Sequence, residues 1–248
     1  QPGAGQMQYG RRLIESRPFL TRVPDDSILV VHRPDGSSAQ ASRDAVVDTK
    51  KTHVAYTRDE SGKATLSVNG AVVKTGTVRG DLSDWDEGFR LALGNELTED
   101  RPWLGELYRV ALYARSDGTA ADPIVLYEFR EGAGRVVKDT SGVGKPLNLE
   151  IEDVSAIKWL DGGGLRISRP TLIASSGPAA RLTEAVKRSK GFRIEAWIKP
   201  ANRTQAGPAR IVTLSKDTGV RNFTLGQKAG AYEVRFRTSA TSSNGEPS

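Results

Sequence analysis

The chain has 248 residues, of which 37% are hydrophobic, enough for one large β domain or two ordinary ones. Its 26 glycines and 12 prolines favour a fold with many turns. The absence of cysteine excludes disulfides, thiolate metal sites and a cysteine nucleophile. The net charge of +6 arises from 36 basic residues interleaved with 30 acidic ones, so we expect a mixed-sign surface and no nucleic-acid partner. No apolar stretch approaches the ~20 residues of a membrane span.

The first half of the chain reads as an arm followed by strands. Residues 1–27 break every short apolar run with basic residues or proline, and we expect an N-terminal arm there. From Thr52 onward apolar and polar residues alternate, as they do in half-buried strands. Asn69-Gly70 interrupts this pattern and predicts a tight hairpin, because both central residues of such a turn need a positive φ. Further strands are predicted at 89–93 and 107–113.

A linker rich in Gly, Asp and Pro is predicted at residues 119–124. It divides the chain into 28–118 and 125–248. Short strand patterns alternate with turns beyond it. The only convincing helix pattern covers 178–189, with a proline in its first turn and a glycine just past its end. Strands at this spacing with one short helix predict an all-β sandwich of two antiparallel sheets and argue against βαβ units.

Four segments carry motifs that occur together in one domain family. VLYEFREGAGRVVKDTSGVGKPLNL contains an aromatic-x-Phe, an EGxG and a DTSGxG motif, and FRIEAWIKP contains an EAW strand. HVAYTRDESGKATLSVNGAVVKTG ends in a VNG hairpin, and LALGNELTEDRPWLGELYRVALYARS in a closing strand. Together they resemble the LamG-like domains of the concanavalin A-like lectin/glucanase superfamily, which implies a jelly-roll sandwich.

The order of these segments is inverted relative to the family. The segments that open a family domain lie within 125–248, those that close it lie within 50–116, and each occurs once. Three explanations remain open: a circular permutation of one sandwich, a fragment of two neighbouring domains, or strand exchange between chains in a homo-oligomer. We expect 28–118 and 125–248 to form one permuted or strand-exchanged domain together.

The polar loop GNELTEDRPWLGE carries the predicted ligand-binding residues, Asn95, Glu96, Arg101 and Trp103. These side chains offer donors, acceptors and an aromatic plate, the combination that sugar- or peptide-binding surfaces use. A loop packed on itself, with Trp103 folded into the sandwich, explains the same residues equally well.

The other tryptophans are assigned by their neighbours. We expect Trp159 and Trp197 in the core, since Trp197 lies inside an alternating strand, and Trp85 partly exposed between two aspartates. His53 is interpreted as a side chain at a strand end.

Carboxylate residues suggest two further kinds of site, a calcium site and a catalytic site. The resemblance implies that calcium could be bound, and Asp139 in DTSGVG is the residue we assign to it, ahead of Asp59 and Asp84. Asp139 could instead cap a turn through its own side chain. Glu150 and Glu152 share a strand face, as the carboxylates of glycosidases do, but they lack the third carboxylate of that pattern. We therefore assign no catalytic residue and do not expect an enzyme.

The resemblance implies a non-catalytic binding or adhesion module for extracellular carbohydrate or a protein partner. It also implies an exported bacterial protein, located outside the cell or in the periplasm. The alternative is a structural subunit or interdomain scaffold of an extracellular bacterial assembly, and a glycoside hydrolase or lyase ranks third.

Overall fold

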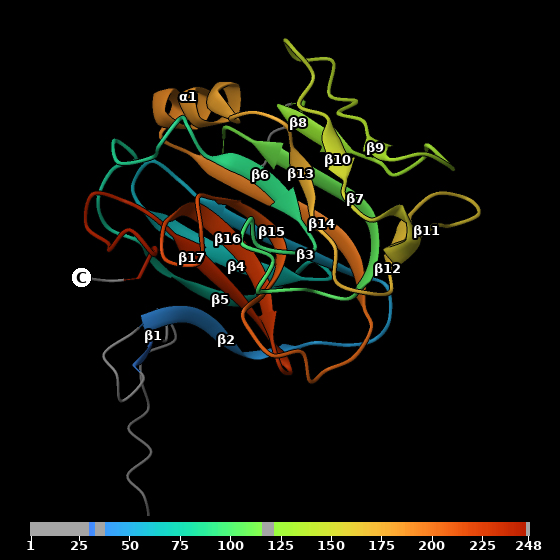
Figure 1. The fold of residues 1–248 in the computed structure, drawn as a ribbon. Coiled ribbons are helices and arrows are strands. Elements are labelled where there is room, and N and C mark those ends of the chain that lie inside the picture. Colours follow the sequence, from blue (N-terminus) through green and yellow to red (C-terminus); the bar gives the residue numbers. More distant parts are fainter. Residues whose placement is uncertain (1–29, 33–37, 116–121, 247–248) are drawn as a thin grey trace, which may run out of the picture.

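The computed structural model of the chain describes residues 30–32, 38–115 and 122–246 (Figure 1). Within these residues the strands form two antiparallel sheets packed face to face, with one α-helix at the end of the sandwich. The predicted all-β sandwich is confirmed. No helix among the described residues has the length and apolar character that crossing a bilayer requires.

Sheet A contains nine strands, in the spatial order β1-β2-β17-β16-β15-β6-β13-β10-β9. Its members in chain order are β1 (Val30–His32), β2 (Ser38–Val46), β6 (Arg90–Leu93), β9 (Val136–Val137), β10 (Leu149–Ile151), β13 (Ile173–Ser175), β15 (Ala209–Ser215), β16 (Arg221–Lys228) and β17 (Ala231–Phe236).

Sheet B has the order β11-β12-β7-β14-β3-β4-β5, and β8 pairs with β7 beside this path. Its members are β3 (Thr52–Arg58), β4 (Lys63–Val68), β5 (Ala71–Thr77), β7 (Gly105–Tyr113), β8 (Val125–Tyr127), β11 (Ile157–Trp159), β12 (Leu165–Ile167) and β14 (Phe192–Pro200). A 3-10 turn, η1 (Val154–Ala156), precedes β11.

Strands from the two halves of the chain alternate in both sheets. In sheet B, β14 lies between β7 and β3, so Ile194 is opposite Leu112 on one side and Tyr56 on the other. In sheet A, β6 lies between β13 and β15. Neither half therefore has its own pair of sheets, and each supplies strands that fill the gaps of the other.

Local sequence signals determine two elements directly. The turn between β4 and β5 contains Asn69 with φ 51° and Gly70 with φ 80°, which confirms the predicted hairpin. The helix α1 (Ala180–Ser189) confirms the predicted helix, and it buries Leu182 and Val186 against the sandwich. It ends at Lys190, which adopts the left-handed conformation one residue before the expected glycine.

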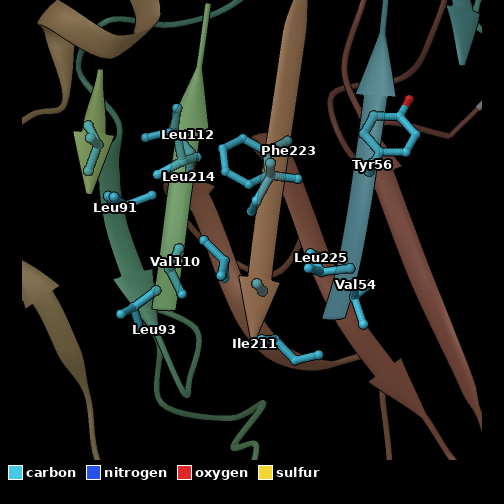
Figure 2. Close-up of a cluster of buried hydrophobic side chains, with 14 of the residues drawn as sticks. Val54, Tyr56, Leu91, Leu93, Val110, Leu112, Ile211, Leu214, Phe223 and Leu225 are labelled. Atoms are coloured by element: carbon cyan, nitrogen blue, oxygen red, sulfur yellow. The ribbon is translucent and has the colours of Figure 1, made fainter. Parts of the chain in front are cut away.

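The core lies between the sheets, where alternate strand residues point inward (Figure 2). Trp85 belongs to this core and is only 2% exposed, so the expectation of a partly exposed side chain was wrong. Its ring packs within 5.2–6.0 Å of the rings of Phe192, Phe223 and Phe236, measured between centroids. The segment between β5 and β6 folds over the end of the core, and this apolar contact outweighs the two flanking aspartates.

Candidate binding surface

The loop between β6 and β7, residues 94–104, holds the predicted ligand-binding residues. Trp103 is 0% exposed, and its indole Nε1 donates a hydrogen bond to Oε1 of Gln227 at 2.9 Å. Gln205 also donates to this oxygen, at 3.0 Å, so β16 and the loop share a buried amide network. Gly105 makes room for the indole, because a Cβ at this position would lie 2.4 Å from Cη2 of Trp103. The aromatic plate of this loop therefore faces the interior.

Two of the predicted polar residues of the loop, Asn95 and Glu96, are also turned inward. Glu96 is 0% exposed and accepts a hydrogen bond from Nε of Arg210 at 2.8 Å, together with one from the hydroxyl of Ser215. Asn95 is buried, and its Oδ1 accepts from the backbone N–H groups of Glu96 and Arg101. Of the four predicted residues only Arg101 reaches solvent. This is the self-packed arrangement, and a ligand-binding role for the loop stays a prediction.

Asp139 caps a turn. Its Oδ1 accepts from the N–H groups of Leu126 and Ser141, and its Oδ2 accepts from Leu147 N–H and Arg181, each at 3.0–3.1 Å. Burial raises the pKa of this carboxyl, but the backbone donors outweigh burial and hold the pKa below its usual value. Four donors thus occupy the oxygens that calcium would need. No group of three or more metal-ligating side chains forms among the described residues.

The two carboxylates considered for catalysis do not share a hollow, because Glu150 lines one of about 550 Å³ beside residues 180–182 and Glu152 does not. Glu150 and Glu152 are exposed at and beside β10, as the sequence indicated. Two further buried carboxylates pair with arginines of sheet A: Glu96 of the 94–104 loop pairs with Arg210, and Glu233 of β17 pairs with Arg235 at 2.7 Å.

The outer face of sheet B exposes side chains to solvent. On β14, the residues Ile194, Ala196 and Ile198 face the core, which sends Glu195 and Trp197 to the opposite side. Trp197 is 38% exposed, so its expected place in the core was wrong. In the strand FRIEAWIKP, Trp197 alternates with the same positions as the charged residues Arg193, Glu195 and Lys199. This shared side is the sequence signal that places Trp197 on the outer face.

Trp159 was also expected in the core and is only partly buried. It lies on β11 at the edge of sheet B, and its indole Nε1 donates to the carbonyl of Gly134 at 3.0 Å.

Trp197 rests on a stacked histidine. His53 lies opposite it on β3, and the two rings are 4.7 Å apart between centroids with an interplanar angle of 21°. Burial is the main cause that lowers the pKa of His53, so the ring is held in its neutral form. Nζ of Lys51 lies 4.1 Å from the ring centre of Tyr108 and 5.9 Å from that of Trp197.

These groups border a hollow of about 310 Å³. It is lined by Lys51, Tyr108, Arg109, Glu128, Arg130 and Trp197, with Gly162 and Gly163 at its edge. We call this hollow and its exposed tryptophan the Trp197 surface. Its lining combines an aromatic face with hydrogen-bond donors and acceptors, which is the composition expected of a ligand site.

Ion pairs beside the Trp197 surface fix its side chains. Glu195 pairs with Arg109 at 3.1 Å and with Arg193. Burial raises the pKa of Glu195, but these arginines outweigh burial and the pKa lies below its usual value.

Glu106 is held in the same way by Arg166 at 2.8 Å, by Lys199 at 3.5 Å and by the hydroxyl of Tyr108. Burial, together with this hydrogen bond, raises the pKa of Tyr108 to about 12. The phenol therefore keeps its proton, and the aromatic wall of the hollow stays uncharged.

The two antiparallel sheets form a β-sandwich consistent with the concanavalin A-like jelly-roll fold. Residues 5–117 match the Laminin_G_3 family, described as the concanavalin A-like lectin/glucanases superfamily. Over the residues that it covers, this match agrees with the resemblance predicted from the sequence motifs. All matched residues precede the linker, and the resemblance of 125–248 stays a prediction. Comparison with curated proteins gives no match.

Proposed function

We propose that the domain is a non-catalytic binding module that holds extracellular carbohydrate against Trp197. The observation that carries this proposal is an exposed indole, 38% accessible, beside a polar hollow in a protein whose Trp85 and Trp103 are buried. Aromatic rings present an apolar face with a polar edge, which suits the apolar face of a sugar ring. The neighbouring guanidinium and carboxylate groups can bond its hydroxyls.

The Trp197 surface is pre-organised, which supports a binding role. The stack on His53 fixes the plane of the indole, and the paired Glu195 fixes Arg109. Side chains already held in place lose less conformational entropy when a ligand arrives, so more of the contact energy appears as affinity.

A thermal-shift screen against a panel of polysaccharides, followed by calorimetry on the best ligand, tests this proposal. A ligand at about a hundredfold excess over Kd should stabilise the protein by roughly 2.7 kcal/mol. Trp197→Ala should weaken binding more than about tenfold, by the loss of one aromatic anchor. Trp159→Ala, which alters another partly exposed tryptophan outside the hollow, is the matched control. Equal affinity of wild type and Trp197→Ala would overturn the proposal.

Calcium dependence and export both remain predictions. Running the screen with calcium and again with a chelator tests the first. If calcium raises the melting temperature of wild type but not of Asp139→Asn, Asp139 is a ligand despite its four donors in the structure. Fractionation of the native cells tests the extracellular or periplasmic location.

A second candidate is a structural subunit that assembles by strand exchange, and the alternation of strands from the two halves favours it. Because β14 fills the gap between β3 and β7, a second chain could supply the same strand. The contrasting proposal is one permuted domain closed within a single chain. Light scattering coupled to size exclusion distinguishes them: a monomer at every concentration supports closure, and concentration-dependent oligomers support exchange.

A further inference from the structure

We propose that the Trp197 surface selects acidic sugar units, with a carboxylate on the sugar seated between Lys51 and Arg130. This inference rests on the proposed function and names the ligand class of the same site. It follows from the distribution of charged side chains around the hollow.

The hollow itself has an excess of positive charge. Lys51, Arg109 and Arg130 contribute three cations to its lining, and Glu128 contributes the only carboxylate in that lining. Glu128 lies 3.4 Å from Arg130, whose side chain is 76% exposed. Arg109 is already paired with Glu195. The exposed guanidinium of Arg130 has five N–H donors, so it keeps donors for a ligand beyond its contact with Glu128, and Lys51 is the second cation that a ligand meets.

The carboxylates around the hollow are already neutralised. Glu195 pairs with Arg109 and Arg193, and Glu106 pairs with Arg166 and Lys199. Each of these two carboxylates thus faces two cations, so the outer face of sheet B remains net positive. An anionic ligand approaching Trp197 meets no unpaired carboxylate among these groups.

Lys51 is the cation with which a ligand carboxylate would form an ion pair. Its ammonium group is placed over the rings of Tyr108 and Trp197, and among the described residues no carboxylate lies within ion-pair distance of it. The cation–π contacts hold the charge beside the indole on which the sugar would stack. A carboxylate on that sugar therefore gains an ion pair, whereas a neutral sugar does not.

A pair of ligands that differ only in charge tests the inference. Oligogalacturonate and its methyl ester share one backbone, and esterification removes the negative charge from each unit. Calorimetry should show the acid form binding about tenfold more tightly, because esterification removes the negative charge that pairs with Lys51 and Arg130. The difference should shrink at high salt, because exposed ion pairs are screened.

Charge variants assign the effect to this hollow. The double variant Lys51→Gln/Arg130→Gln should lose the preference for the acid form and bind acid and ester with similar affinity. Lys63→Gln is the matched control, because it removes one positive charge at the exposed start of β4, away from the hollow. It should keep wild-type affinity. Wild-type and variant melting temperatures should agree, since both lysines are exposed.

The outcomes separate this inference from the proposed function. Equal binding of acid and ester, both weakened by Trp197→Ala, would overturn acidic selection and leave the carbohydrate surface intact. Acid binding that persists in Trp197→Ala and in the charge variant would place the site elsewhere and overturn the inference. If no glycan in the broader panel binds, the proposed function fails and the inference fails with it.

Discussion

Two regions of this molecule contain similar residue types, but the side chains of one point into the core and those of the other point to solvent. The 94–104 loop and the Trp197 surface each combine a tryptophan, an arginine and a glutamate. In the loop, Trp103 and Glu96 are 0% exposed and bond to strands of the other half of the chain. On the surface, Trp197 is 38% exposed and the glutamates pair with neighbours along the sheet. Composition alone therefore does not distinguish a packing element from a binding site.

The difference between the two regions lies in their partners. Gln227 and Arg210 lie on β16 and β15 and offer buried donors and acceptors, so the loop satisfies its polar groups by folding inward. The outer face of sheet B has no second layer of described residues over Trp197, and its polar groups satisfy one another laterally. The following predictions test this contrast.

Trp103→Ala should produce the largest change. Removing a fully buried indole leaves a cavity between the loop and β16, and we expect the free energy of unfolding to fall by about 3–5 kcal/mol. Urea denaturation measures it. Trp197→Ala is the control and should change stability by less than about 1 kcal/mol. Similar losses in both variants would contradict the contrast between the regions.

Glu96→Gln should have the next largest effect. It leaves the buried guanidinium of Arg210 without a charged partner, which typically costs about 3 kcal/mol. Asp100→Asn breaks the exposed pair with Arg101 in the same loop, and should cost less than about 1 kcal/mol. Chemical denaturation of the two variants compares a buried pair with an exposed one. A small loss in Glu96→Gln would show that Arg210 can reach solvent.

Asp139→Asn should cost about 1–3 kcal/mol near neutral pH, because hydrogen bonds to a charged acceptor are lost. The folded state lowers the pKa of Asp139 below 3.8, so its contribution is present above that value and disappears as pH falls through the lower folded pKa. Melting curves of wild type and variant should therefore converge in strong acid. A constant difference from pH 7 to pH 2 would contradict this assignment.

The smallest effect concerns His53. Its pKa in the folded state is below 6.5, so the unfolded chain takes up the proton first and stability falls as pH drops through that value. Protonation beneath Trp197 should also quench its fluorescence, with a midpoint below 6.5. His53→Gln should lack this transition, and Trp197→Phe should remove its signal. A midpoint above 6.5 would indicate a solvated histidine outside the stack.

Some features of this protein follow from local sequence alone. The Asn69-Gly70 turn requires two residues with positive φ, and the helix at 180–189 has its apolar residues at helical spacing. The alternation in FRIEAWIKP determined a strand with one buried face. These signals come from residues close together in the chain, which is why they were sufficient to predict the all-β fold.

Only the tertiary structure decided which side chains reach solvent. The buried place of Trp103 depends on Gln227, and that of Trp85 depends on Phe192, Phe223 and Phe236, all far away in sequence. The outward side of Trp197 followed from parity only once Ile194 and Ile198 were known to face the core. Alternation along a strand shows that its residues point to two opposite faces, but it does not show which face the second sheet covers. The covered face is the one whose apolar residues, taken over all strands of the sheet, pack against the opposite sheet.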